Sequence, residues 1–237
     1  MKITSLQNDK VKYWVSLKEK KNRDLNKEFL IEGDHLINEA KKFDLIKETI
    51  SINENDNADY IVTEDIMKKI SCQKSICERA AIVKFIPDKE PNGNILVLDN
   101  IQDPGNLGTI IRSSIAFNFK TIILSDTSVD EYNPKVIRST EGMIFHQNIL
   151  RKNLINYLPI LKDKGYTIVG TDVINGHNIK EIPKDNICLV IGSEGKGMSP
   201  EIKSLCDTFA YINMNNNCES LNAGVAASIL MYEVNNE

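Results

Sequence analysis

The stretch ILVLDNIQDPGNLGTIIR, residues 95–112, joins three local patterns without a break. Its first four residues are continuously apolar, as in a strand buried on both faces of a parallel sheet. A loop dense in Asn, Asp, Gly and Pro follows, and a helical pattern begins near Asn106, which stands where it can cap that helix. The stretch therefore predicts a strand, a polar loop at its carboxyl end, and a covering helix.

The same alternation continues to the C-terminal end. Further buried strands are predicted at 121–124, 167–170 and 188–191. Helices are predicted at 107–117, 153–164, 200–206 and 221–234. This order predicts an α/β fold with a mostly parallel sheet, in which ligands bind beyond the carboxyl ends of the strands.

The N-terminal part has a different pattern of predicted helices and strands. Residues 87–94 are rich in turn formers and have no apolar pattern, which predicts a boundary between a domain over 1–90 and one over 95–237. Before this boundary, helices are predicted at 11–21, 35–42 and 66–70, and strands at 29–33, 49–52, 60–63 and 80–85. The pattern indicates a small α/β domain, with Thr63 capping its last helix.

The composition of the chain argues against several classes of protein. The chain has 237 residues, 41% of them hydrophobic, but no apolar run that could span a bilayer. Its polar start lacks a signal-peptide core, so we expect a cytoplasmic protein. The cysteine count of five is odd and no pair has CxxC spacing, which favours free thiols over a zinc site or a disulfide framework. The three histidines lie outside the polar loops, and we expect no metal.

Two further polar loops follow predicted strands. The loop IGSEGKGMS, residues 191–199, has three glycines that allow a ligand to approach the backbone closely. It matches neither the Walker loop nor the Rossmann fingerprint, because Val190 and Pro200 stand where those motifs need glycine. The loop INMNNNCESLN, residues 212–222, precedes a helix rich in small residues, and Ser220 is predicted to cap that helix.

The formal net charge of −4 does not suggest nucleic-acid binding, but the charge distribution is uneven. Residues 10–27 hold seven basic side chains against two acidic ones, with Tyr13 and Trp14 among them. Such a stretch could hold phosphates and stack on bases. It could equally be a solvated helix face with Trp14 packed inward, and the stretch alone leaves both readings open.

In this order and spacing, the three loops resemble the motifs of the SpoU/TrmH-type RNA 2′-O-ribose methyltransferases, within the SPOUT class. The matching residues are Asp103, Pro104, Asn106, Gly108 and Arg112 in the first loop, Gly192, Glu194, Gly197 and Ser199 in the second, and Ile212, Met214, Ser220, Leu221, Asn222, Ala226 and Ala227 in the third. Asn118, Ala223 and Gly224 depart from the usual family residues, at positions that concern helix packing. Residues 133–139 are similar to a segment of members that act on ribosomal RNA, and residues 1–86 are similar to a small ribosomal-protein-like RNA-binding domain.

The resemblance implies a C-terminal trefoil knot, a homodimer, and S-adenosylmethionine (AdoMet) as methyl donor for a ribose 2′-hydroxyl, on 23S ribosomal RNA by our interpretation. It implies cofactor contacts from Gly192, Gly197, Ile212, Met214 and Leu221. It implies catalytic roles for Asn106, Arg112, Glu194, Ser220 and Asn222. Contacts with RNA are expected from Lys10, Lys12, Lys18, Lys20, Lys21, Arg23 and Arg138. A guanidinium stays protonated, so the physical role we expect for Arg112 is to position a phosphate and stabilise negative charge on oxygen.

Three alternatives remain at this stage. The same motifs occur in members that methylate transfer RNA. A non-catalytic RNA-binding protein could keep the fold, although the polar set of the three loops is intact. A dinucleotide-dependent α/β enzyme is disfavoured by the failed Rossmann and Walker patterns.

Overall fold

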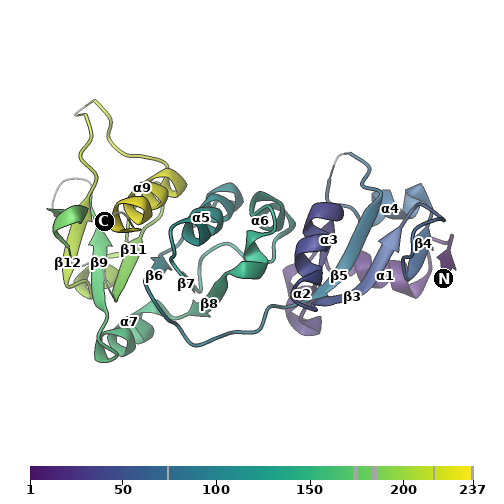
Figure 1. The fold of residues 1–237 in the computed structure, drawn as a ribbon, viewed down its shortest axis with the longest axis horizontal. Helices are drawn as coiled ribbons and strands as arrows, with labels where there is room; N and C mark the ends of the chain where they lie inside the picture. Colours follow the sequence, from purple (N-terminus) through teal and green to yellow (C-terminus); the bar gives the residue numbers. More distant parts are fainter. Residues whose placement is uncertain (74, 173–175, 183–185, 216, 236–237) are drawn as a thin grey trace. The chain divides into compact units, whose positions relative to one another are not determined.

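The computed structural model describes residues 1–73, 75–172, 176–182, 186–215 and 217–235. The chain divides into two compact units (Figure 1). The first contains residues 1–87 together with 130–145, and the second contains 88–129 together with 146–237. Residues 130–145 thus leave the second unit after its β7 strand and pack within the first.

The first unit is a small α/β fold around a mixed five-stranded sheet. Its strands are β1 (Lys2–Ile3), β2 (Glu28–Glu32), β3 (Ile46–Ser51), β4 (Tyr60–Val62) and β5 (Arg79–Lys84), in the order β1-β4-β3-β5-β2. Its helices are α1 (Asp9–Ser16), α2 (Lys20–Asn26), α3 (Asp34–Lys41), α4 (Glu64–Ile70) and α6 (Pro134–Ser139), followed by the 3₁₀ helix η1 (Met143–His146). Thr63 caps α4 as predicted, accepting from the Ile66 N–H at 3.4 Å.

Trp14 settles part of the question about the basic stretch. Its ring is fully buried among α1, α4 and the sheet, and its indole N–H donates to Glu48 at 3.0 Å. The inward packing of Trp14 is therefore confirmed, and this ring cannot stack on a base. The other residues predicted to contact RNA keep at least partial exposure: Lys10, Lys12, Lys18, Lys20, Lys21 and Arg138.

Arg23 corrects two expectations. The single helix predicted over 11–21 is two helices, because the Arg23 guanidinium donates to the carbonyls of Leu17 and Lys18, at 2.8 and 2.7 Å, where α1 has ended. Arg23 is 3% exposed and pairs with Asp130. Its assignment as an RNA contact was therefore wrong, since the guanidinium is used inside the unit.

The segment 130–145 supplies part of the core of the first unit. Tyr132 stacks on Phe85, with ring centroids 3.9 Å apart, and also contacts Phe29. Phe145 packs on Phe29 from the other end of the segment. The Tyr132 hydroxyl accepts from the Ile86 N–H at 3.0 Å. These contacts join four aromatic rings from sequence-distant parts of one unit.

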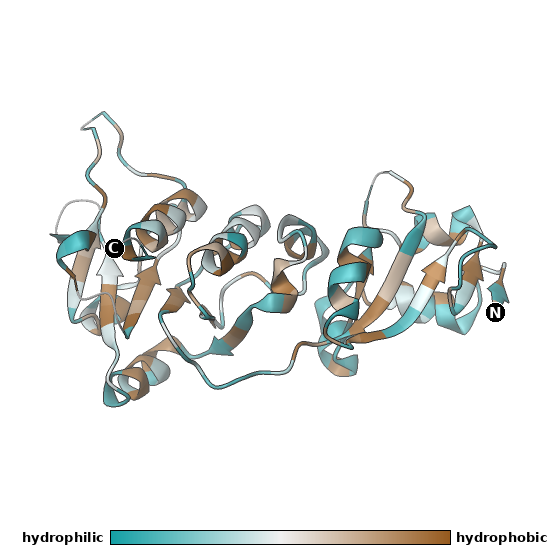
Figure 2. Cartoon of the chain, in the orientation of Figure 1, coloured by the Kyte–Doolittle hydropathy of each residue, from teal (hydrophilic) through white to brown (hydrophobic). Residues whose placement is uncertain are grey.

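The second unit is the predicted parallel fold. Its strands are β6 (Ile95–Leu98), β7 (Thr121–Ser125), β8 (Asn148–Lys152), β9 (Thr167–Thr171), β10 (His177–Asn178), β11 (Ile187–Ile191) and β12 (Thr208–Tyr211). They pair in parallel in the order β10-β12-β9-β11-β6-β7-β8. The predicted central strands are confirmed, and β11 is hydrophobic along its length (Figure 2). The edge strands β8 and β10 were not predicted, because they lack a continuous apolar run.

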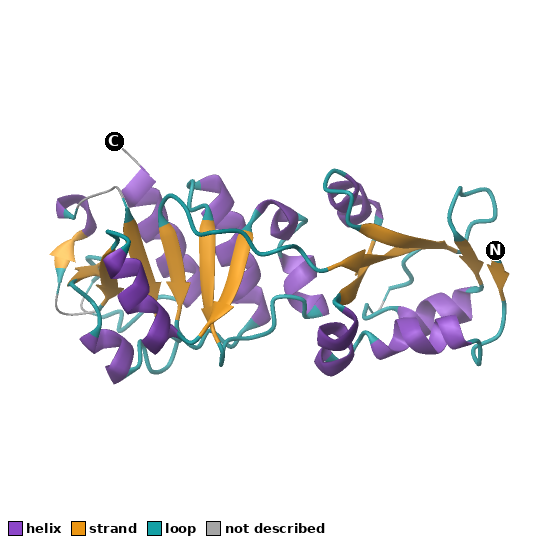
Figure 3. Ribbon diagram, turned by 90° about the horizontal axis from the view of Figure 1, so that it is seen from below, coloured by secondary structure: helices purple, strands orange, loops and turns teal. Residues whose placement is uncertain are grey.

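Helices cover both faces of this sheet (Figure 3). They are α5 (Pro104–Ala116), α7 (Leu154–Asp163), α8 (Pro200–Ser204) and α9 (Ala223–Asn235), with the 3₁₀ helix η2 (Ile179–Glu181). Helices α7 and α8 share one hydrophobic cluster with the strands. Helices α5 and α9 lie side by side (Figure 1), joined by a 2.7 Å hydrogen bond between the hydroxyls of Ser113 and Ser228. The small residue Gly224 allows this approach, because a Cβ there would lie 3.3 Å from Cβ of Thr109.

The five cysteines are free thiols, as predicted. Burial raises the pKa of Cys206 to about 11, so this thiol stays protonated near neutral pH. Within the described ranges, no helix is long and apolar enough to cross a membrane. In the same part of the chain, His, Cys, Asp and Glu side chains nowhere gather in threes that could hold a metal ion.

We predict that Asp130→Asn lowers the free energy of unfolding of the first unit by roughly 3–5 kcal/mol, because it leaves the buried Arg23 charge without its partner. Asp24→Asn is the matched control, since it breaks an exposed ion pair with Lys20 and should change stability by less than about 1 kcal/mol. Urea unfolding followed by the fluorescence of Trp14, the single tryptophan of the chain, measures both. Equal losses in the two variants would contradict the prediction.

Candidate active site

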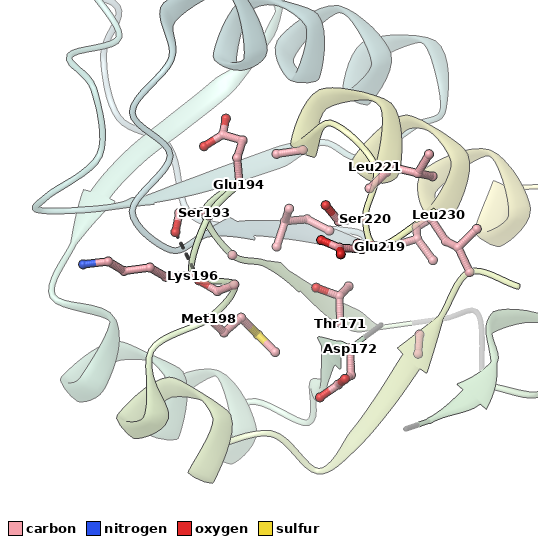
Figure 4. Close-up of a pocket in the computed structure, with 18 of the residues that line it drawn as sticks. Thr171, Asp172, Ser193, Glu194, Lys196, Met198, Glu219, Ser220, Leu221 and Leu230 are labelled. Carbon is pink, nitrogen blue, oxygen red and sulfur yellow. Dashed lines mark hydrogen bonds between the residues drawn. The ribbon is translucent and has the colours of Figure 1, made fainter. Parts of the chain in front are cut away.

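A cavity of about 380 Å³ lies at the carboxyl ends of β9, β11 and β12 (Figure 4). This is where the predicted parallel sheet should bind its ligand, and the volume is in the range of small-molecule sites. Its apolar lining comes from β12, the third loop and α9 on one side and from β11 and its loop on the other: Ile191, Met198, Ala210, Ile212, Met214, Leu221, Ala223, Ala226 and Leu230. An apolar cavity with polar groups at its rim suits a flat heterocycle that carries a charged tail.

The loop after β11 forms one wall of the cavity by folding back on itself. Ser193 and Gly197 exchange two backbone hydrogen bonds of 3.0 and 2.9 Å, and Gly197 has a φ of +65° that favours glycine. Gly192 lies against this turn so closely that a Cβ there would be 2.1 Å from the carbonyl carbon of Gly197. Gly195, at the tip, has open space around it. Glycine is therefore required sterically at 192 and not at 195.

Asp99 holds the C-terminal end of the same loop through hydrogen bonds. One of its carboxylate oxygens accepts from both the N–H and the hydroxyl of Ser199, at 2.7 and 2.9 Å. Asp99 is 6% exposed, so these hydrogen bonds form away from bulk water. The first residue after β6 thus fixes the last residue of the loop after β11.

A relay of side-chain hydrogen bonds joins all three loops. The Asn222 amide oxygen accepts from the N–H groups of Gly224 and Val225, at 3.0 and 3.2 Å. Its amide nitrogen is therefore left to donate, and it donates to the Asn106 oxygen at 2.8 Å. The Asn106 nitrogen donates in turn to the carboxylate of Glu194. Each amide has one orientation that satisfies its neighbours, so the relay has a fixed direction.

These contacts correct two predicted caps. Asp103, and not Asn106, caps α5, because its carboxylate accepts from the Asn106 N–H at 2.9 Å. Asn222, and not Ser220, caps α9 through the bonds just described. Both caps lie at residues of the predicted motifs, and the corrections leave the Asn106 side chain and the Ser220 hydroxyl available for other contacts.

The predicted site residues meet in part. All five predicted cofactor contacts line the cavity: Gly192, Gly197, Ile212, Met214 and Leu221. Glu194 and Ser220 line it too, whereas Asn106 and Asn222 reach it through the relay. Arg112 is exposed on α5 and does not line the cavity. In the described part of the chain its guanidinium forms no hydrogen bond or ion pair, and the Glu194 carboxylate accepts from Asn106 instead.

Several cavity residues escaped the sequence analysis. Thr171 ends β9 and Asp172 follows it, and the rule that ligands bind beyond strand ends could have flagged both. Met198, Lys203 and Glu219 gave no such signal, because the motif resemblance does not include them. Asn216 of the third loop lies outside the described residues.

The chain is similar to proteins of one family over most of its length. Residues 93–232 match the model of the SpoU rRNA Methylase family, and residues 8–81 match the MRM3-like substrate binding domain. The 23S rRNA (guanosine(2553)-2′-O)-methyltransferase RlmP of Bacillus subtilis is 34% identical over 98% of both chains.

Solved structures of methyltransferases share the fold. The AdoMet-bound rRNA methyltransferase from Sinorhizobium meliloti superposes with a TM-score of 0.88 at 25% identity, covering 99% of this chain and 97% of that one. The SpoU methyltransferase AviRb from Streptomyces viridochromogenes, in complex with AdoMet, gives 0.86 over 97% of both chains at 23% identity, which shows the fold alone. The matched family model covers more than half of the sequence, including all three loops of the cavity, and the chain therefore belongs to the SpoU rRNA methylase family.

Proposed function

We propose that this protein transfers a methyl group from AdoMet to a ribose 2′-hydroxyl of 23S ribosomal RNA. The observation that carries the proposal is the relay from Asn222 through Asn106 to Glu194, which joins the three motif loops beside the cavity. The 34% identity to a 23S rRNA 2′-O-methyltransferase, over an alignment that covers 98% of the chain, supports the substrate class. The match of residues 8–81 to a substrate-binding domain supports RNA recognition by the first unit.

The cavity fits AdoMet by its chemistry. Its apolar side chains suit the adenine ring, and the turn at 193–197 offers backbone groups at the rim. In the proposal Gly192, Gly197, Ile212, Met214 and Leu221 hold the cofactor. When bound, AdoMet supplies a methyl group already activated by the sulfonium charge.

The protein must then align the ribose oxygen with the methyl carbon and sulfur. With AdoMet bound, the ribose oxygen would take up its methyl group and would pass the hydroxyl proton to solvent at the open rim. In the proposal Glu194 and Ser220 contact the ribose at the cavity rim, and the relay holds Glu194 in place. Arg112, which is exposed and has no partner in the described chain, holds the RNA phosphate and stabilises negative charge on the reacting oxygen.

RNA contacts are proposed from six basic residues of the first unit that are exposed or half-buried, namely Lys10, Lys12, Lys18, Lys20, Lys21 and Arg138. Some of these charges already have protein partners, such as Glu48 for Lys10 and Asp24 for Lys20, and these pairs would have to exchange on binding. A homodimer, a trefoil knot and a cytoplasmic location also belong to the proposal, and family membership supports them.

The test of the function is transfer of radiolabelled methyl from AdoMet to total RNA of a bacterial strain that lacks this protein. We expect label in 23S RNA, at a site that resists alkaline cleavage because the 2′-hydroxyl is blocked. Label confined to transfer RNA would keep the chemistry and overturn the substrate. Absence of label from every RNA, with no AdoMet binding, would favour a non-catalytic RNA-binding protein.

We predict that Arg112→Ala lowers the rate of methyl transfer by at least about a hundredfold, because it removes a charge that contacts the reacting group. The dissociation constant for AdoMet should stay within about twofold, since Arg112 does not line the cavity. Arg112→Lys keeps the charge but loses the paired donors of the guanidinium, so its rate of methyl transfer should lie between those of the wild type and Arg112→Ala. Calorimetry and single-turnover transfer measure the two quantities. Full activity in Arg112→Ala would remove this residue from the mechanism.

We predict that Gly192→Ala abolishes AdoMet binding, because the added methyl would overlap the backbone of Gly197 and displace the turn. Gly195→Ala is the matched control and should bind AdoMet normally, since open space surrounds that residue. Calorimetric titration of each folded variant with AdoMet gives the comparison. Normal binding by Gly192→Ala would show that the turn does not shape the cofactor site.

A further inference from the structure

The cavity contains one carboxylate whose role the relay does not explain. Five charged side chains line it, namely Asp172, Glu194 and Glu219 against Lys196 and Lys203. Asp172 has Lys203 at 3.4 Å, and Glu194 accepts from Asn106. Within the described residues, Glu219 has neither a hydrogen-bond partner nor an ion-pair partner.

The position of Glu219 makes its charge relevant to the ligand. It precedes Ser220 in the third loop, and Figure 4 shows the two side chains together in the cavity, with Thr171 and Asp172 across from them. The Lys196 side chain extends away from the other labelled residues in the same view, so its charge does not offset that of Glu219. The part of the cavity next to the loop before α9 is therefore negative.

Methyl transfer changes the charge of the ligand. Before the reaction the cofactor carries a sulfonium, an ammonium and a carboxylate, with a net charge of +1. The methyl group passes to the ribose oxygen and the bonding electrons stay on sulfur. The product, S-adenosylhomocysteine (AdoHcy), therefore has a neutral thioether and a net charge of zero. An unpaired carboxylate beside the sulfur would favour the substrate form over the product form.

We propose that Glu219 is a specificity-determining residue, whose carboxylate faces the sulfonium and makes the cavity bind AdoMet more tightly than AdoHcy. This inference rests on the proposed function. When the methyl group leaves, the sulfur becomes neutral and its attraction to the Glu219 carboxylate is lost. The affinity for the ligand therefore falls, which assists product release. Glu219 is exposed, so water and salt screen its field, and the effect is on the order of fivefold in the ratio of the two affinities.

The experiment compares dissociation constants for AdoMet and AdoHcy in the full-length protein, by calorimetry at low and at high salt. Glu219→Gln should lower the preference for AdoMet about fivefold, mainly by weakening AdoMet binding. Glu201→Gln is the matched control, because it removes the same charge from an exposed side chain of α8 that does not line the cavity. Glu219→Asp should keep most of the preference, and added salt should reduce it in the wild type but not in Glu219→Gln.

Two outcomes would overturn the inference. An unchanged ratio in Glu219→Gln would show that the carboxylate does not face the sulfonium. Equal weakening of both ligands would place it at the ammonium, which substrate and product share, or assign it to loop structure. Failure of the wild type to bind either ligand would instead refute the proposed function, so the two failures are distinguishable.

Discussion

The arrangement of the site depends on one constraint, the fixed direction of the hydrogen-bond relay through two amide side chains. Asn222 can donate to Asn106 only because its oxygen is occupied by the first turn of α9. The start of a helix therefore determines which way the amide of a second helix points, and that amide determines where the Glu194 carboxylate lies. Three segments that are distant in sequence are therefore held in one arrangement, because each amide of the relay can satisfy its hydrogen-bond partners in a single orientation.

The loops of the relay are also held at their ends. Asp99 holds the loop after β11 at Ser199, and the turn between Ser193 and Gly197 sets the shape of its centre. Both anchors are backbone or buried contacts within the protein, so they hold the cavity wall without needing a ligand atom. Preformed sites spend less binding free energy on ordering the protein.

The sequence predicted the second unit well because its signals are local. Continuous apolar runs identify central strands, and the polar loops after them identify the edge of the sheet at which the cavity lies. The caps were harder: Asp103 and Asn106 are both cap formers within one turn, and only the structure shows which accepts the bond. Arg23 was misjudged for a different reason. Its partner Asp130 lies 107 residues away, and no local pattern reports such a pairing.

The segment 130–145 has a consequence for how such proteins can arise. Its aromatic residues Tyr132 and Phe145 complete a core whose other members, Phe29 and Phe85, lie in the first 87 residues. The first unit is thus encoded in two separate parts of the reading frame. Recombination that moved only the leading part onto another methyltransferase would deliver a core with missing rings and an uncompensated buried guanidinium. The two units are consequently expected to be inherited together and to diversify by point substitution rather than by exchange of modules.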